Sequence, residues 1–177
     1  MSAIAYVAFG SNLGAREDSL ERARRLLVDD PGVVSLRLSR WMETEPVGTV
    51  DAPATGGKYL NAVAELDTRL SALELLRLCL NCEAQLGRVR GVRNAPRPID
   101  LDLLLYGEQV LDLPASENDP ALMVPHPRML ERVFVLEPLV ELAPETVHPV
   151  SGRTIAAHLA DLRDVRTVDW RAPGLST

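Results

Sequence analysis

Two aspartates, Asp100 and Asp102, are the residues of this chain best suited to chemistry. They alternate with Ile99, Leu101 and Leu103, and this period of two predicts a β-strand that carries both carboxylates on one face. Their Cα atoms would lie about 6.7 Å apart at roughly 3.3 Å per residue. Two like charges about 4 Å apart repel by about 4 kcal/mol at an effective dielectric near 20. A hard cation such as Mg²⁺ turns that repulsion into ligation, so the pattern predicts a metal site.

Arginines crowd the segment just before this strand, at Arg88, Arg90, Arg93 and Arg97. Planar guanidiniums grip phosphate oxygens through paired hydrogen bonds. A polyphosphate bridged to the aspartates by metal, and held by arginines on its other oxygens, would use both sets of charges. The segment therefore favours phosphoryl transfer. The alternative is a solvated strand face on which aspartates and arginines pair as surface ions.

The overall charge of the chain limits its partners. A formal net charge of −6 and a pI near 5.1 argue against nucleic acid or an acidic membrane as the partner, because proteins that bind these surfaces carry a basic excess. A chain of 177 residues can bury one sizeable core. We therefore expect a single domain over residues 1–177, acting as a monomer on small-molecule substrates.

Nothing in the sequence predicts a membrane span or an export signal. No stretch reaches the ~18 apolar residues that a membrane helix needs, and residues 1–12 lack the basic start of a signal peptide. Cys79 and Cys82 fall inside a leucine-rich helical run, which favours buried, reduced thiols over a redox pair. We therefore expect a cytoplasmic protein.

The apolar pattern predicts the order strand, helix, strand, strand, helix, strand. This order is that of an α+β fold with a ferredoxin-like antiparallel sheet (β-α-β-β-α-β). Additional C-terminal helices would cover its other face, giving three layers, α/β/α. The expected strands are 3–9, 33–42, 59–66 and 99–106 with a short return strand at 110–113; the expected helices are 15–28, 71–86, 128–134, 135–142 and 151–162; and residues 43–58 are expected to form a long loop.

Four segments together resemble the 6-hydroxymethyl-7,8-dihydropterin pyrophosphokinase family. Their order and spacing are similar to the family's through about residue 162, and the run RNAPRPIDLDLL is the most specific part. The resemblance implies transfer of a pyrophosphoryl group from ATP to a pterin alcohol in folate biosynthesis. The segments are AYVAFGSNLG (5–14), KYLNAVAEL (58–66), GRVRGVRNAPRPIDLDLLLYG (87–107) and VPHPRMLERVFVLEPL (124–139).

By that similarity, Asp100 and Asp102 would hold two Mg²⁺ ions on the triphosphate of ATP. Arg88 and Arg97 match arginines that bind phosphates and stabilise the transition state, and these four residues are the expected catalytic set. Two departures are visible: Asn94 stands in a shortened arginine loop where some members carry Trp, and Pro127 stands where some carry Tyr. The full set implied to contact ATP is Glu83, Arg88, Arg90, Arg93, Arg97, Ile99, His126 and Arg132. Without the resemblance, Glu83 could be a solvated helical acid and His126 a structural histidine.

The pterin is expected to lie between the rings of Tyr59 and Phe134, because a flat heterocycle needs aromatic faces. Asn61 can offer a donor and an acceptor to its amide-like edge. The alternative for both aromatics is ordinary core packing. The resemblance adds contacts from Thr44, Pro46 and Val47 to the same ring, and it gives Ser11 and Asn12 a supporting role.

Two other functions remain open from the residues alone. A nucleotidyl or glycosyl transferase could use the D-x-D pair and Mg²⁺ on a sugar nucleotide. A ferredoxin-like module could also bind a protein or ligand without catalysis, since this fold hosts many functions.

Overall fold

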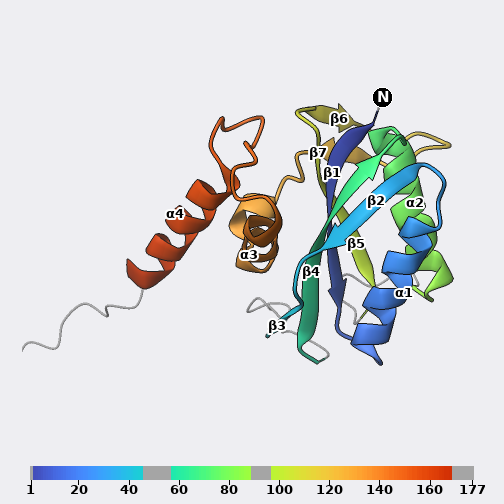
Figure 1. Cartoon of the computed structure of the whole chain (residues 1–177), viewed down its shortest axis with the longest axis horizontal. Coiled ribbons are helices and arrows are strands. Elements are labelled where there is room, and N and C mark those ends of the chain that lie inside the picture. The colour runs from blue at the N-terminus through green and yellow to red at the C-terminus, as the bar shows by residue number, and fades with distance from the viewer. Residues whose placement is uncertain (1, 46–56, 89–96, 169–177) are drawn as a thin grey trace, which may run out of the picture.

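A computed structural model gives the structure of residues 2–45, 57–88 and 97–168. It shows a mixed α/β fold with an antiparallel sheet and, in this part of the chain, four α-helices (Figure 1). The strands are β1 (Ala3–Ser11), β2 (Val33–Leu38), β3 (Met42–Thr44), β4 (Tyr59–Thr68), β5 (Asp100–Tyr106), β6 (Leu111–Leu113) and β7 (Leu122–Val124). The helices are α1 (Arg16–Val28), α2 (Ala72–Gln85), α3 (Val133–Leu142) and α4 (Ile155–Val168), with a short 3₁₀ turn η1 (Met129–Glu131) before α3.

The main sheet has the order β2-β4-β1-β5, and β3 also pairs with β4. All of these pairs are antiparallel. Gly10 in β1 lies opposite both Asn61 in β4 and Asp100 in β5. These three residues therefore form one row across the sheet, and Ala8 lies opposite Asp102 in the next row on the same face.

Two apolar cores lie on opposite faces of this sheet. The alternation of β1 sends Val7 and Phe9 into the first core, with α1 and α2, and Tyr6 into the second core, with α3 and α4. Figure 1 shows α1 and α2 on one side of the strands and α3 on the other, with α4 beyond α3. The three expected layers are present. No helix in the described residues is long and apolar enough to cross a membrane.

Helix α2 begins where the sequence predicts. The Ser71 hydroxyl accepts a hydrogen bond from Glu74 N, and the Glu74 carboxylate accepts one from Ser71 N, which completes a capping box. Leu75, Cys79 and Cys82 then form the stripe that packs in the first core. The expected burial of both thiols is confirmed.

Several expected boundaries were wrong. The predicted strand 33–42 ends at Leu38, because the Ser39 hydroxyl accepts the hydrogen bond of Val63 N and interrupts the pairing. The chain then rejoins β4 as β3, so Glu43 and Thr44 belong to a strand and not to the predicted loop. The helix expected from residue 151 begins at Ile155, after Gly152 adopts a φ of 68°.

The segment 110–113 does not return to β5. Residues 111–113 of this segment form β6, which pairs with β7 in a separate two-stranded sheet. The outer edge of β5 is already bonded, since Leu101 N donates to Glu83 and Leu104 O accepts from His126 N. The predicted helix 128–134 was also wrong, because η1 occupies that segment and α3 begins at Val133.

Candidate active site

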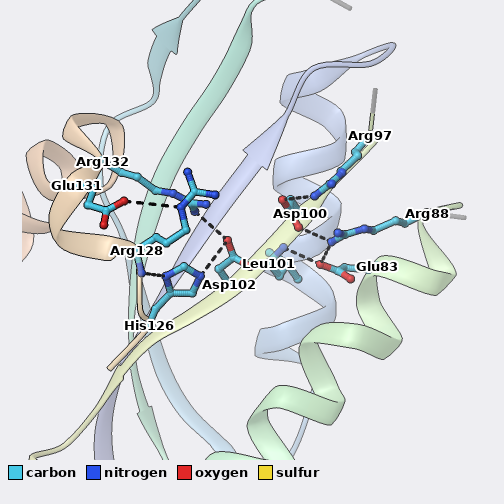
Figure 2. A network of polar contacts seen from close by, with 10 residues as sticks. All are labelled: Glu83, Arg88, Arg97, Asp100, Leu101, Asp102, His126, Arg128, Glu131 and Arg132. Carbon is cyan, nitrogen blue, oxygen red and sulfur yellow. Dashed lines mark hydrogen bonds and ion pairs between the residues drawn. The ribbon is translucent and has the colours of Figure 1, made fainter. Parts of the chain in front are cut away.

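Strand β5 carries both aspartates on the face of the sheet that α3 covers. Leu101 and Leu103 point into the first core, so their neighbours Asp100 and Asp102 point to the opposite face. The predicted strand with two carboxylates on one face is confirmed. Figure 2 shows the polar contacts that converge on these carboxylates from both sides of β5.

Asp100 is held by two arginines. Arg97 Nη1 donates to Asp100 Oδ2 at 2.8 Å, and Arg88 Nη1 donates to Asp100 Oδ1. Arg88 also donates to Glu83 Oε1. The side chains of Arg88 and Arg97 are mostly buried, with exposed fractions of 18% and 28%.

Glu83 is a buried acid at the junction of α2 and β5. Its Oε1 accepts a hydrogen bond from Leu101 N at 2.8 Å in addition to the bond from Arg88. Burial raises the pKa of Glu83, and the Leu101 N–H and the Arg88 charge oppose that rise. The residue is only 2% exposed. The alternative of a solvated helical acid is therefore wrong.

Asp102 faces a histidine and a third arginine. Its Oδ2 lies 3.4 Å from Arg132 Nη1 and 3.9 Å from His126 Nε2. His126 Nδ1 accepts a hydrogen bond from Arg128 N at 3.1 Å, so the neutral ring carries its proton on Nε2, toward Asp102. Burial and the nearby Asp100 charge raise the pKa of Asp102, while burial lowers the pKa of His126.

Of the residues expected at the pterin, those that the structure describes lie on the same face, beyond Gly10. Asn61 is buried and its Nδ2 donates to Thr44 Oγ1 at 2.8 Å, while Tyr59 lies opposite Thr44 in the β3–β4 pair. Phe134 is half-buried at the start of α3, and the Arg132 guanidinium lies 5.7 Å from the centre of its ring. Arg132 thus connects Asp102 with Phe134.

Asn12 binds the main chain of an arginine, and its expected role in supporting the ring pocket stays a prediction. Asn12 Oδ1 accepts from Arg97 N at 2.8 Å, and Asn12 N donates to Arg97 O at 3.2 Å. These bonds fix the main chain of Arg97 next to the end of β1. Ser11 is fully buried beside it, and its hydroxyl has no hydrogen-bond partner among the described residues.

A cleft of about 230 Å³ opens between α2, β5 and β7. Glu83, Arg88, Asp102 and His126 contribute its polar groups. The rest of the lining is apolar. Pro127 was noted from the sequence as a departure from the family, whereas the other residues were missed: Leu76, Leu80, Leu101, Leu103, Ala121, Leu122 and Met123. The signal was present in α2, since Leu76, Leu80 and Glu83 follow a helical spacing of four and three residues beside the core stripe.

Some predicted site residues do not join this arrangement. The side chain of Ile99 is fully buried in the first core, so only its main chain could reach a nucleotide. Pro46, Val47, Arg90, Arg93 and Asn94 lie outside the described residues. Within the part of the chain that the structure describes, no group of three or more His, Cys, Asp or Glu side chains is arranged to hold a metal.

Asp102 nevertheless fits Mg²⁺. This ion binds through one or two carboxylates and completes its coordination with water and substrate phosphates. Asp102 supplies such an oxygen at the wall of the cleft, because its side chain is 36% exposed. Its polar neighbours Arg132 and His126 lie 3.4 and 3.9 Å from Oδ2, which are long distances for hydrogen bonds. The donor set therefore suits an ion shared with a bound polyphosphate.

The fold and this site define an α/β protein that combines paired carboxylates, arginines and an apolar cleft, a combination suited to a nucleotide polyphosphate. The chain belongs to the 7,8-dihydro-6-hydroxymethylpterin-pyrophosphokinase (HPPK) family, whose model matches residues 6–144.

Relatives from several organisms support this assignment. The 2-amino-4-hydroxy-6-hydroxymethyldihydropteridine pyrophosphokinase of Bacillus subtilis is 44% identical over 142 residues, covering 80% of this chain and 79% of the relative. The protein of the same name from Pseudomonas aeruginosa is 41% identical over 155 residues, covering 88% and 89%. The folic acid synthesis protein fol1 of Schizosaccharomyces pombe is 38% identical over 159 residues, and the match spans only 20% of its length.

Solved structures share the fold. A crystal structure of wild-type Plasmodium falciparum HPPK-DHPS with pterin and p-hydroxybenzoate matches with a TM-score of 0.76. The sequence identity is 15%, and the match covers 97% of this chain but 45% of the other. The chain thus corresponds to less than half of that longer protein.

Proposed function

We propose that this chain transfers the pyrophosphoryl group of ATP to 6-hydroxymethyl-7,8-dihydropterin, which gives the pterin diphosphate and AMP, in folate biosynthesis. The observation that carries the proposal is the convergence of Arg88, Arg97 and Arg132 on Asp100 and Asp102, beside an apolar cleft. The names of the bacterial relatives describe the same reaction.

Asp100 and Asp102 would hold two Mg²⁺ ions against the triphosphate. Bound there, the ions would neutralise phosphate charge and activate the attacking hydroxyl oxygen. The three arginines bind the remaining phosphate oxygens and stabilise the charge that develops when the bond to AMP breaks. Reactions of this type depend mainly on such positioning and charge stabilisation.

The cleft beside α2 is the proposed site of the nucleotide. Leu76, Leu80 and Met123 give it an apolar lining for a base. His126 faces its polar end and can donate through Nε2 to a phosphate oxygen. Glu83 and Ile99 have buried side chains. We therefore propose that Glu83 contributes to ATP binding indirectly, by holding Arg88, and that Ile99 contributes through its main chain.

The pterin would lie across the row that joins Asn61 and Asp100. Asn61 Oδ1 can accept from the ring while Thr44 holds the amide nitrogen, and Tyr59 and Phe134 would supply the stacking faces. This arrangement directs the hydroxymethyl group toward Asp100 and the triphosphate. The proposed backbone contacts of Pro46 and Val47, and the proposed phosphate contacts of Arg90 and Arg93, belong to the same model of the complex.

The finer architectural assignments are also proposals. The strand order β2-β4-β1-β5 and the two covered faces support a ferredoxin-like class for the sheet. We assign residues 1–177 to one domain that acts as a monomer in the cytoplasm.

The direct test is release of AMP from ATP in the presence of 6-hydroxymethyl-7,8-dihydropterin and millimolar Mg²⁺. The expected result is AMP formation that requires the pterin. Asp102→Ala should reduce turnover by about three orders of magnitude, since it removes a metal ligand, while the circular dichroism spectrum stays unchanged. Turnover at the wild-type rate in this variant would remove the two-metal mechanism.

The competing transferase class predicts a different ligand. A nucleotidyl or glycosyl transferase would not bind the pterin in the presence of a nonhydrolysable ATP analogue. Saturable pterin binding under that condition, measured by calorimetry, would exclude this class.

A further inference from the structure

The acids and arginines of the site form two neighbouring groups of ion pairs, one at Asp100 and one at Asp102, which together are called the cluster here. Arg88 bridges Glu83 and Asp100, Arg97 pairs with Asp100, and Arg132 approaches Asp102 (Figure 2). The cluster therefore contains three carboxylates and three guanidiniums: Glu83, Asp100 and Asp102 with Arg88, Arg97 and Arg132. Their formal charges cancel.

This balance affects which ligands the site can accept. A divalent cation alone would leave an excess of positive charge among partly buried groups. A triphosphate, with about four negative charges near neutral pH, would leave an excess of negative charge. Two Mg²⁺ ions and one triphosphate together preserve the balance. Such imbalances are costly where water is partly excluded.

The three arginines are not equivalent. Arg88 has a second carboxylate partner in Glu83, whose side chain is only 3% exposed and which is fixed by the N–H of Leu101. Arg97 and Arg132 pair with Asp100 and Asp102 respectively, and neither side chain has a second carboxylate partner among the described residues. Arg88 can therefore stay in place when an aspartate turns to a metal, whereas the other two must find a new anion.

We propose that Arg97 and Arg132 are exchangeable counter-ions, which neutralise Asp100 and Asp102 in the ligand-free protein and transfer to phosphate oxygens when metal and nucleotide bind together. The inference rests on the proposed function for its ligands. The exchange couples the two binding events, because phosphate oxygens replace the carboxylates as partners of the guanidiniums at the moment the carboxylates take the metal. Glu83 retains Arg88 as a fixed cation throughout.

The test measures binding of Mn²⁺ to the ligand-free protein, with the free ion counted by electron paramagnetic resonance. Arg97→Gln and Arg132→Gln should each tighten Mn²⁺ binding by about threefold to tenfold, the range expected for removing one partly exposed competing charge. The same substitutions should weaken binding of a nonhydrolysable ATP analogue in the presence of Mg²⁺. This opposite change of the two affinities is not expected from a structural defect.

Matched variants separate local exchange from overall charge. Arg128→Gln removes the same charge from the neighbouring surface. Because Arg128 is exposed and pairs with Glu131 at 3.7 Å, this variant should tighten Mn²⁺ binding by less than about twofold. Arg97→Lys and Arg132→Lys keep a cation beside the aspartates and should bind Mn²⁺ like the wild type. If the glutamine variants fail to fold, Arg97→Met and Arg132→Met replace them, because methionine keeps much of the aliphatic stem without the charge.

Three results would overturn the exchange. The first is a Mn²⁺ affinity that stays unchanged or falls in both glutamine variants. The second is an Arg128→Gln variant whose Mn²⁺ affinity rises as much as that of the glutamine variants of Arg97 and Arg132. The third is an equal rise in the lysine variants. The outcome is separate from that of the proposed function: pterin-dependent AMP release by the wild type with no tightening in the variants rejects the exchange alone, whereas absence of AMP release rejects the function.

Discussion

Arg97 reaches Asp100 from a main chain that is itself held in place. The two hydrogen bonds with Asn12 fix its backbone at the end of β1, and Nη1 donates to Asp100. The row of residues proposed for the pterin ring begins on the far side of Gly10, at Asn61. In the proposed complex, the guanidinium would therefore lie at the phosphate end of the site.

Arg97→Ala is accordingly predicted to affect the chemical step more than pterin binding. Loss of one charged donor to the reacting phosphates should lower kcat by about 100-fold, while the Kd for pterin should change by less than about twofold. Steady-state AMP formation and pterin titration with a nonhydrolysable ATP analogue give the two values. A selective loss of pterin affinity would contradict the role assigned to this arginine.

Glu83 couples the stability of the fold to pH. Because burial raises its pKa above the ordinary value of 4.5, the folded protein holds this proton more tightly than the unfolded chain. The resulting stability is fully present below pH 4.5 and is lost as the pH rises through the folded pKa. Ionisation of this carboxylate as the pH rises therefore costs the fold part of that stability.

Substitutions at Glu83 should separate these effects. Glu83→Gln keeps an acceptor for Leu101 N but cannot ionise. The free energy of unfolding of this variant minus that of the wild type should therefore increase between pH 4 and pH 7. Turnover of the variant should fall. Glu83→Leu leaves the Leu101 N–H unpaired and should lower that free energy by about 2 kcal/mol. Urea unfolding at several pH values measures both. A relative stability of Glu83→Gln that falls with rising pH would show that ionised Glu83 stabilises the fold.

Three adjacent strands bring the proposed substrate groups into line. The antiparallel register of β4, β1 and β5 sets Asn61, Gly10 and Asp100 side by side, and glycine is the member that leaves the space between the other two side chains open. A Cβ at position 10 would lie 3.5 Å from Asn61 Oδ1 and 3.9 Å from the Asp100 Cβ, which are ordinary contact distances.

Gly10→Ala is therefore predicted to fold but to bind pterin poorly. Alanine is favoured over glycine inside a strand, so the free energy of unfolding should stay the same or rise by up to about 1 kcal/mol. The added methyl group would occupy the space between Asn61 and Asp100, and we expect the Kd for pterin to rise by about tenfold, a loss typical of a misfitted methyl group. Calorimetry checks the affinity, and an unchanged Kd would place the pterin away from this row.

The sequence is informative about long, periodic segments and weak about short ones. The alternation in 99–106 and the capping box at Ser71 predicted β5 and the start of α2 because local patterns determine both. Strands β3 and β7 have three residues each, which is too few for a period to show. Strand β6 pairs with β7 because Glu83 and His126 already bond the outer edge of β5, and the local sequence of β6 does not reveal these bonds. Likewise, no local pattern reveals that Glu83 meets the N–H of Leu101.

Both cores depend on one sheet. Val7 and Phe9 face α1 and α2, while Tyr6 faces α3 and α4, so each long central strand contributes to both layers. Polar contacts strengthen the second side, since Arg37 donates to Glu65 in the sheet and to Leu142 O at the end of α3. Loss of the sheet would expose both cores at once, which supports assignment of the chain to a single domain that unfolds cooperatively.

The two thiols provide a probe of this cooperativity. Cys79 and Cys82 are buried in the first core, and burial raises the pKa of the Cys82 thiol to about 11, so neither should react with a bulky disulfide reagent at pH 8 in the native state. In a urea series, thiol labelling should coincide with loss of the far-ultraviolet circular dichroism signal, which also reports α3 and α4. Labelling that precedes this loss would mean that α1 and α2 separate from the sheet while the second core persists. The aspartates and their arginines come from segments on both sides of β5. Separation of α1 and α2 from the sheet would therefore disrupt the proposed active site at urea concentrations below the main unfolding transition. If labelling and the loss of circular dichroism coincide, the site and the fold are lost together.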